Sequence, residues 1–217
     1  MSIPTFYATD VDRPEMVAFL PPNCMHVLEI GCGEGTFAQH YSSASERWGV
    51  EPNAFSAGKA KAFLNKVLVG TFEQVSQELP DNYFDLVICN DVIEHMEDHD
   101  LFLESIKIKM REGAHLVGSL PNIRYVSALF ELLVKKDWQY RPYGTLDRSH
   151  LRFFTRKSLL RTFAAHGYSV RKFSGINRAG RPFYALHKSI PIALIVLLTL
   201  GYYRDVPYHQ FAFAIQK

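Results

Sequence analysis

The chain has 217 residues, of which 47% are hydrophobic and 21% charged, and its formal net charge is +2. This length favours one domain, and the composition excludes a disordered chain, a collagen and a long coiled coil. The first residues carry no basic segment followed by an apolar run, so we expect no secretory signal and a cytoplasmic protein. The three cysteines are expected to be reduced, and Cys32 and Cys89 are interpreted as packing residues.

Charge is divided unevenly along the chain. Residues 1–110 hold 7 basic and 17 acidic side chains, whereas residues 111–217 hold 17 basic and 5 acidic ones. A basic C-terminal half suggests an anionic substrate, a phosphate-bearing surface or nucleic acid. The alternative is that the two halves neutralise each other across a fold interface.

The first half of the chain alternates strand and helix patterns. Short apolar runs predict strands at 25–30, 47–51, 66–69, 84–89 and 114–119. Helices are expected from residue 35 and after the N-cap residues Asn53 and Asp98. This alternation indicates a parallel sheet with helices on both faces, whose ligands bind at the carboxyl ends of the strands.

The second half is less regular. Helices are predicted at 123–136 and after the N-cap Thr155, and strands at 168–173 and 211–215. Residues 137–152 mix aromatic residues, arginines, proline and glycine, which indicates a loop or flap. We therefore expect a Rossmann-like, seven-stranded, mostly parallel sheet with a helical and flap insertion after the fifth strand. One domain is expected over 1–217, with a cofactor-binding part at 1–120 and a substrate flap and C-terminal part at 121–217.

The longest apolar run, residues 190–200, is broken by Pro191 and falls well short of the ~20 residues that span a bilayer. A buried helix is the preferred interpretation. The alternative is an interfacial membrane helix, because Lys188 and Arg204 flank the run.

A glycine-rich segment, Glu29-Ile30-Gly31-Cys32-Gly33-Glu34-Gly35, directly follows the first predicted strand. Glycines there permit a tight turn and a close approach of the backbone to a ligand. Glu51 ends the second strand, where an acid can accept hydrogen bonds from a ribose diol. Thr36 stands where dinucleotide-binding loops carry their third glycine, which disfavours a nicotinamide cofactor.

On these residues the chain resembles the class I S-adenosylmethionine-dependent methyltransferases. The segment from Phe84 to His95 is similar to the fourth strand and following loop of their small-molecule members, including the quinone-biosynthesis type. Two downstream segments, 119–122 and 146–155, resemble a bacterial subgroup associated with surface-polysaccharide and glycan assembly. The first part of this resemblance covers roughly the first 120 residues.

The resemblance implies S-adenosylmethionine as cofactor. Gly31, Gly33 and Gly35 would pass its methionine and ribose, and Glu51 would bind the ribose hydroxyls. Asn90 and Asp91 would lie beneath the methionine part, and Thr71 and Phe72 beside the adenine, although many relatives have Asp where Gly70-Thr71-Phe72 stands. The expected cofactor-binding residues are Glu29, Gly31, Gly33, Gly35, Glu51, Thr71, Phe72, Asn90 and Asp91.

Methyl transfer to a hydroxyl needs alignment and a base, and histidine is the natural base near neutral pH. His95 and His150 are the candidate catalytic residues, each with a purely structural contact as the alternative. His95 and His99, near Glu94 and Asp91, could also hold a metal, but no metal site is predicted.

Arginine and aromatic residues interleave in the flap. Arginine suits phosphate and carboxylate groups, and aromatic rings stack on sugars or bases, so the flap is interpreted as a substrate lid rather than a solvated loop. The expected substrate-binding residues are Asn122, Tyr143, Arg148 and Arg152.

The chain is therefore predicted to transfer a methyl group to a hydroxyl of a small anionic acceptor, such as a glycan precursor or nucleotide sugar. The alternatives are a quinone-precursor or RNA methyltransferase and a non-catalytic cofactor-binding subunit. Asn90-Asp91-Val92-Ile93 stands where base-modifying members carry D/N-P-P-Y/F, which disfavours nucleic acid. The expected partner is the small-molecule acceptor, and the interfacial alternative for residues 190–200 would add a weak contact with a membrane surface.

Overall fold

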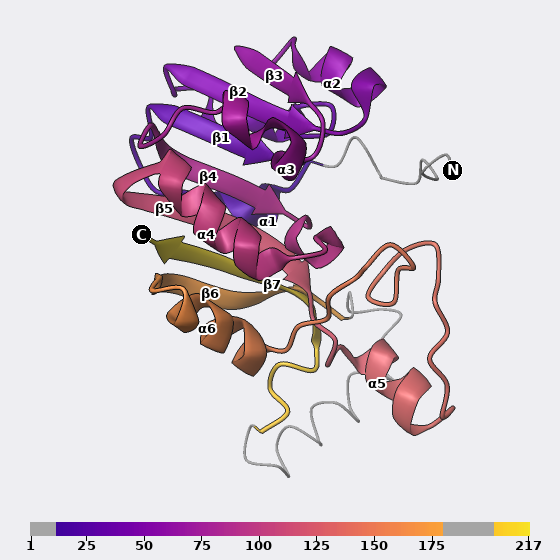
Figure 1. Ribbon diagram of the computed structural model, residues 1–217. Helices are drawn as coiled ribbons and strands as arrows, with labels where there is room; N and C mark the ends of the chain where they lie inside the picture. The colour runs from indigo at the N-terminus through magenta and orange to yellow at the C-terminus, as the bar shows by residue number, and fades with distance from the viewer. Residues whose placement is uncertain (1–11, 180–201) are drawn as a thin grey trace.

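The computed structural model describes residues 12–179 and 202–217 (Figure 1), so the apolar run at 190–200 lies outside the described residues. A seven-stranded sheet in the order β3-β2-β1-β4-β5-β7-β6 forms its centre. The strands are β1 (His26–Ile30), β2 (Glu46–Glu51), β3 (Lys66–Val69), β4 (Phe84–Asn90), β5 (Met110–Pro121), β6 (Ser169–Arg178) and β7 (Tyr208–Gln216).

Strands β1 to β5 pair in parallel, whereas β7 is inserted antiparallel between β5 and β6. The predicted seven-stranded, mostly parallel sheet is therefore confirmed. Because β7 runs in the opposite direction, its first residues lie beside the last residues of β5, with Gln210 opposite Pro121. The start of β7 and the ends of β4 and β5 thus share one edge of the sheet.

The helical segments follow the capping residues that the sequence contains. Asn53 accepts hydrogen bonds from the backbone N–H groups of Phe55 and Ser56, and Asp98 accepts one from Leu101. The segments are α1 (Pro14–Val17), η1 (Thr36–Tyr41), α2 (Ala54–Ala60), α3 (Phe72–Val75), η2 (Ser76–Glu78), η3 (Ile93–His95), α4 (His99–Lys109), α5 (Val126–Leu133) and α6 (Arg156–Ala165).

Several predicted boundaries differ from the structure. The helix expected from residue 35 is the six-residue 3-10 helix η1, which begins after Gly35 in the left-handed conformation. The helix expected at 123–136 is shortened to α5, because Asn122 and Tyr125 close a turn before it. β5 and β6 are longer than expected, because each pairs with β7 over most of its length.

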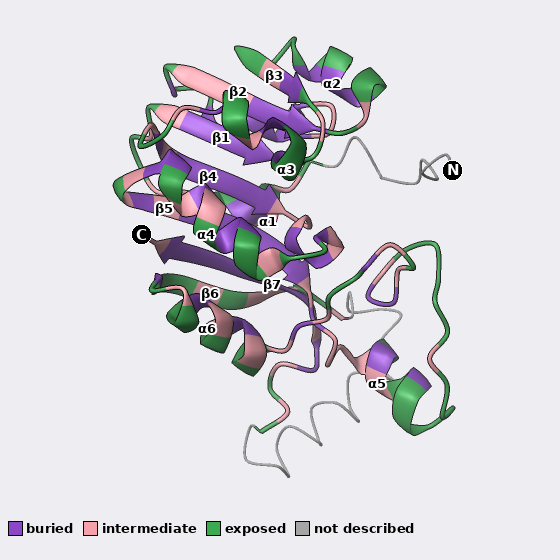
Figure 2. Ribbon diagram, in the orientation of Figure 1, coloured by how far each residue is buried: buried purple, intermediate pink, exposed green. Residues whose placement is uncertain are grey.

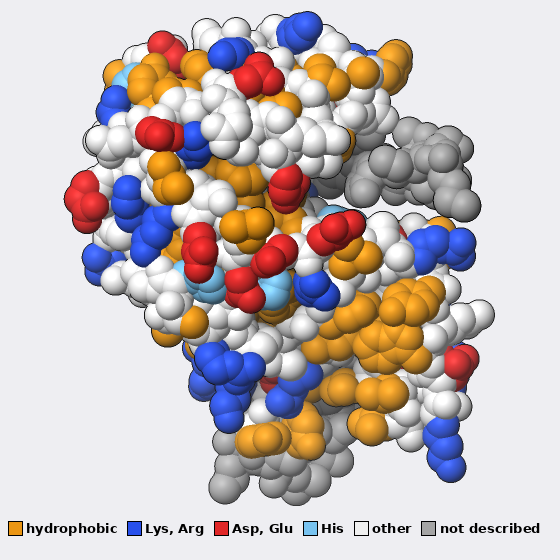
Figure 3. Space-filling model, viewed as in Figure 1, with side chains coloured by type: hydrophobic (Ala, Val, Ile, Leu, Met, Phe, Trp, Pro, Cys, Tyr) orange, Lys and Arg blue, Asp and Glu red, His pale blue; other side chains and the backbone are white. Residues whose placement is uncertain are grey.

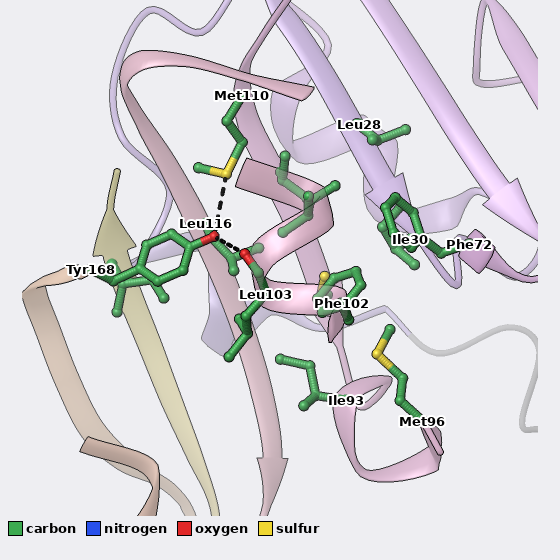
Figure 4. Close-up of a cluster of buried hydrophobic side chains, with 14 of the residues drawn as sticks. Leu28, Ile30, Phe72, Ile93, Met96, Phe102, Leu103, Met110, Leu116 and Tyr168 are labelled. Carbon is green, nitrogen blue, oxygen red and sulfur yellow. Dashed lines mark hydrogen bonds between the residues drawn. The ribbon is translucent and has the colours of Figure 1, made fainter. Parts of the chain in front are cut away.

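Two apolar clusters cover the two faces of the sheet, as expected for helices on both sides. One cluster joins the sheet to α3, α4 and α6, and the other joins it to α1, η1 and α2. In the first, the Tyr168 hydroxyl donates to the Leu103 carbonyl at 2.9 Å and approaches Met110 Sδ (Figure 4). The buried strands stand out against the mostly exposed outer faces of the helices in Figure 2.

α5 and the segment that follows it project beyond the carboxyl edge of the sheet (Figure 1). Residues 134–155, here called the flap, contain isolated bridges between Arg141 and Asp147 and between Asn122 and Phe154, but no longer strand or helix. Within the described ranges, no helix has the length and apolar character needed to cross a membrane.

Candidate cofactor and acceptor site

The glycine-rich segment is a tight turn between β1 and η1. Gly31 and Gly35 have φ values of +69° and +82°, in the left-handed region that favours glycine. A Cβ atom on Gly31 would lie 2.7 Å from Val92 Cγ2, and one on Gly35 would lie 3.0 Å from Ala60 Cα. Backbone geometry and packing therefore both require glycine at these two positions.

Glu51 lies at the end of β2, next to this turn. Its Oε2 accepts a hydrogen bond from Gly33 N at 2.9 Å, and its Oε1 accepts one from Asn53 N at 2.8 Å. Burial raises the pKa of this carboxyl. Two backbone donors thus fix a carboxylate beside the glycines, and each oxygen keeps a lone pair for a further donor such as a ribose hydroxyl.

Glu29 is buried beneath the turn. It accepts a hydrogen bond from the Tyr41 hydroxyl at 2.5 Å, and burial raises its pKa to about 7. Thr71 is the exposed N-cap of α3, whereas Phe72 is buried with its ring edge-on to Phe102 at 5.1 Å. Glu29 and Phe72 therefore contribute to packing around the predicted cofactor site.

Asn90 ends β4 with its side-chain nitrogen and oxygen both buried. Neither atom has a hydrogen-bond partner in the part of the chain that the structure describes. An amide left in this state is costly unless another molecule supplies its donor and acceptor. The side-chain amide of Asn90 is therefore suited to bind a polar ligand at the carboxyl ends of the strands.

Asp91, the next residue, has φ +54° and binds three side chains. Its Oδ1 accepts hydrogen bonds from Ser119 Oγ at 2.9 Å and from Gln210 Nε2 at 2.7 Å. The Arg13 guanidinium forms an ion pair with its Oδ2 and also donates to Ser119 Oγ at 3.1 Å. Sequence reasoning missed Arg13 and Gln210, because neither stands in a motif.

The two candidate bases lie together. The His95 and His150 rings are 4.8 Å apart, and each Nδ1 donates to a backbone carbonyl, that of Ser149 or Thr145. With the proton on Nδ1, Nε2 is the acceptor nitrogen of each neutral ring. Burial and the neighbouring His150 lower the pKa of His95.

Glu94 lies beside these histidines and is 1% exposed. Its Oε1 is 4.0 Å from His150 Nε2, and neither carboxylate oxygen has a hydrogen-bond partner among the described residues. Burial, followed by the charge of Asp91, raises the pKa of this carboxyl well above its usual range. The group is therefore favoured as a neutral acid.

One set of donor atoms among the described residues is compact enough for a metal ion. Glu94, His95 and His150 each offer one ligand atom, and these atoms all lie within 4.8 Å of one another. Nitrogen and oxygen donors of this kind suit a divalent transition metal. His99 is outside this set and packs edge-on against Phe154 at 5.2 Å.

The expected substrate residues are spread over the flap and its base. Asn122 is buried, and its amide donates to the backbone carbonyls of Asp205 and Tyr208, so it holds the chain entering β7. Arg148 is exposed, and the exposed Arg152 donates to the Glu97 carbonyl. Tyr143 is 77% exposed.

A cavity of about 270 Å³ lies between α5 and the flap. Its lining residues are Ser127, Ala128, Glu131, Arg141, Tyr143, Gly144, Thr145, Leu146 and His209. His209, one residue before Gln210 on β7, was not singled out from the sequence, because only the antiparallel insertion of β7 brings it here. Burial lowers the pKa of its imidazole, against the opposing effect of Asp91.

The chain is similar to curated proteins that carry the name ubiquinone biosynthesis O-methyltransferase. The chain is 30% identical over 166 residues to a ubiquinone biosynthesis O-methyltransferase of Aeromonas salmonicida, covering 70% of this chain and 66% of that protein. It is 26% identical over 162 residues to the protein of that name from Nitrobacter winogradskyi, covering 71% of this chain and 61% of that protein. The match thus spans slightly less than two thirds of each relative.

Solved structures share the fold at lower identity. A methyltransferase from Archaeoglobus fulgidus, described as dependent on S-adenosylmethionine, superposes with a TM-score of 0.66 at 19% identity, covering 94% of this chain and 90% of that one. A methyltransferase from Mesorhizobium loti, also described as dependent on S-adenosylmethionine, superposes with a TM-score of 0.63 at 15% identity, covering 94% of this chain and 96% of that one.

The model of a methyltransferase domain matches residues 6–172 of the chain. The sheet order, the glycine turn and these matches confirm the predicted class I fold, and a methyltransferase domain implies the predicted cofactor, S-adenosylmethionine. The chain belongs to the methyltransferase domain family.

Proposed function

We propose that the protein transfers the methyl group of S-adenosylmethionine to a hydroxyl of a small anionic acceptor, such as a glycan precursor or nucleotide sugar. The observation that carries this proposal is the shared edge of the sheet. The glycine turn, Glu51 and the buried amide of Asn90 lie at the strand ends, and β4 is followed there by His95, whose ring is 4.8 Å from that of His150 in the flap. In this proposal residues 1–120 bind the cofactor and residues 121–217 bind the acceptor.

The cofactor is assigned to the ends of β1, β2 and β4. Gly31, Gly33 and Gly35 allow the backbone to approach it, and Glu51 accepts hydrogen bonds from the ribose hydroxyls. Asn90 supplies its amide to the methionine part, and Arg13, held at the same edge by Asp91, can pair with the methionine carboxylate. Glu29 and Phe72 support these groups from below, and Thr71 borders the adenine.

When bound, the cofactor supplies a methyl group on a positively charged sulfur. The residues of the chain align the acceptor, exclude water and receive the proton that its hydroxyl loses. His150 or its neighbour His95 accepts that proton at Nε2, because both Nδ1 atoms already donate to backbone carbonyls. Glu94, which lies beside them as a neutral acid, offers its carbonyl oxygen to the N–H group that forms at His150 Nε2.

The anionic part of the acceptor is assigned to the flap. Arg148 and Arg152 are exposed on it, and arginine binds phosphate and carboxylate groups through paired N–H donors. Tyr143, also exposed, offers a ring for stacking on a sugar or base. Asn122 acts from beneath by holding the chain that leads into β7.

A second candidate acceptor is a quinone precursor. It is favoured by the names of the curated relatives and by the small or apolar residues Ala128, Gly144 and Leu146 on the cavity wall. Hydrophobic side chains also gather on the surface where α5 and the flap lie (Figure 3). The glycan assignment rests instead on the sequence resemblance of segments 119–122 and 146–155.

The test combines calorimetry with a labelled-methyl assay. Calorimetry with S-adenosylmethionine and with its demethylated product is expected to give a dissociation constant on the order of micromolar, about −8 kcal/mol. The assay presents radiolabelled cofactor with sugars, nucleotide sugars, quinone precursors and RNA in parallel. Transfer to nucleotide sugars supports the first assignment, and transfer to quinone precursors supports the second. Transfer to RNA alone, or cofactor binding with no transfer to any acceptor, overturns both.

A further inference from the structure

The cavity between α5 and the flap has both apolar and polar residues on its wall. Its volume of about 270 Å³ lies near the lower end of ligand pockets, which measure roughly 300–1,000 Å³. This is room for a single ring rather than for a nucleotide. Ala128, Gly144 and Leu146 form its apolar part. Its uncharged polar groups include the hydroxyl of Thr145 and the imidazole of His209, and its charged groups are Glu131 and Arg141.

Thr145 places a buried hydroxyl in this wall. The residue is 6% exposed, and its Oγ1 is buried without a hydrogen-bond partner in the two ranges that the structure describes. The backbone around it is fixed, since Arg141 N donates to the Leu146 carbonyl and His150 Nδ1 donates to the Thr145 carbonyl. A buried hydroxyl left in this state favours a ligand that supplies the missing hydrogen bond.

His209 is held equally firmly on the opposite side. Its carbonyl accepts a hydrogen bond from Asn122 N at 2.9 Å, and its ring packs edge-on against Tyr125 with the centroids 4.9 Å apart. Gln210, the next residue on β7, donates to Asp91 at the cofactor edge. The cavity and the proposed cofactor site are therefore one residue apart along a rigid strand.

The charged groups of the wall already have partners. Glu131 is 8% exposed and accepts from Arg141 Nη2 at 2.7 Å and from Lys135 Nζ at 3.0 Å. An anion entering the cavity would compete with Glu131 for these two cations. The wall therefore favours an uncharged group with hydrogen-bonding capacity over a phosphate or carboxylate.

We propose that this cavity receives the ring that carries the methylated hydroxyl, as an uncharged ring with a second hydroxyl that hydrogen-bonds to Thr145 and His209. This inference rests on the proposed function and makes it more specific. The anionic part of the acceptor then stays outside, near Arg148 and Arg152. A polyhydroxylated phenol and a sugar share this chemistry, and the experiment distinguishes them.

The experiment is saturation-transfer NMR on the full chain with S-adenosylhomocysteine bound. Catechol and methyl α-D-glucopyranoside are the two probes, and methyl phosphate is the anionic comparison. The wall is altered by Thr145→Val, by His209→Phe, which retains an aromatic ring against Tyr125, and by Ala128→Trp, which fills the cavity. Thr162→Val on α6 makes the same replacement away from the cavity and serves as the matched control.

At least one probe is expected to bind the wild type and the control. Its affinity should fall about 5- to 10-fold in Thr145→Val and His209→Phe, as for a lost hydrogen bond, and binding should vanish in Ala128→Trp. The probe that binds shows whether the ring of the acceptor is a phenol or a sugar. If Ala128→Trp fails to fold, the nearly isosteric Thr145→Val still tests the assignment.

The inference is overturned if neither probe binds the wild type, or if a probe binds Thr145→Val and His209→Phe as tightly as the wild type. Binding of methyl phosphate that is lost in Thr145→Val also overturns it, because the cavity would then receive the anion. The proposed function fails on other measurements, namely absent cofactor binding in calorimetry or absent methyl transfer. The two failures are therefore distinguishable.

Discussion

Gln210 and Asp91 are separated by 119 positions in the sequence, yet Gln210 Nε2 donates to Asp91 Oδ1 at 2.7 Å. Ser119 and Arg13 bind the same carboxylate, so four segments of the chain meet on one side chain. The polar edge that carries the proposed cofactor site is therefore a connected network, in which each member limits the movement of the others.

Gly31 gives a test of the turn itself. Gly31→Ala places a Cβ 2.7 Å from Val92 Cγ2 at a φ of +69°, and we expect a loss of about 1–3 kcal/mol in the free energy of unfolding. Gly58→Ala is the matched control, because a Cβ there meets no described atom within 4 Å on helix α2. It should be neutral or stabilising by up to about 1 kcal/mol. Equal urea midpoints for the two variants would contradict the assignment.

Glu51 gives a test of the cofactor site. Glu51→Ala should weaken S-adenosylmethionine binding by roughly 1–3 kcal/mol in calorimetry, because the ribose hydroxyls would lose their acceptor. The exposed Glu73, in the first turn of α3, provides the control variant Glu73→Ala, which should bind as the wild type does. An unchanged affinity for Glu51→Ala would remove this residue from the site.

The raised pKa of Glu29 implies that the free energy of unfolding depends on pH. Burial raises its pKa from 4.5 to about 7, so the folded state holds the proton more tightly than the unfolded state between these values. The contribution of Glu29 to the free energy of unfolding is therefore fully present below the unfolded-state pKa. It is lost as pH rises toward 7, and the loss is on the order of 3 kcal/mol. Urea unfolding of Glu29→Gln should lack this loss, because the amide stays neutral while still accepting from Tyr41. A pH profile parallel to that of wild type would contradict the assignment.

The flap arginines are expected to act on the acceptor alone. Arg148→Ala and Arg152→Ala should leave cofactor affinity nearly intact and lower kcat/KM for an anionic acceptor roughly 10- to 150-fold, as for a lost charge-assisted contact of about 1.5–3 kcal/mol. Steady-state kinetics with varied acceptor measure this effect. Full acceptor kinetics in both variants would show that the flap is structural.

The histidines separate base catalysis from packing. His150→Ala should lower kcat by about 10²–10⁴ if it accepts the proton, and His95→Ala is the internal comparison. Cofactor affinity should change little in either variant, which calorimetry can verify. If neither histidine affects kcat, the acceptor needs no base of this kind, as would hold for an amine that is already deprotonated.

Local patterns were sufficient to predict most of the sheet. β3 falls on the predicted 66–69, and the N-caps Asn53, Asp98 and Thr155 begin the helices expected after them. These features depend on a few neighbouring residues, which a single sequence contains. The glycine turn and Glu51 were predicted for the same reason, since a strand, a turn and the next strand follow one another directly.

The parts of the site that depend on distant contacts were not predicted. His209 and Gln210 reach it because β7 inserts antiparallel beside β5, and Arg13 does so because it directly precedes α1 and its guanidinium reaches Asp91 after β4. The pairing of His95 with His150 rather than with His99 likewise depends on how the flap folds back on η3. No local spacing encodes these contacts.

The position of β7 also has a consequence for synthesis. All other strands precede β7 in the sequence, yet it lies between β5 and β6, so a nascent chain can assemble β1 to β5 but leaves β5 with an open edge until β7 emerges. β6 has no other strand to pair with in the described sheet. Until β7 has been synthesised, Asp91 also has no hydrogen bond from Gln210, and His209 is absent from the cavity wall. Ligand binding is thus expected only after β7 has paired with β5 and β6. Methyl transfer would then be restricted to molecules in which the sheet is complete.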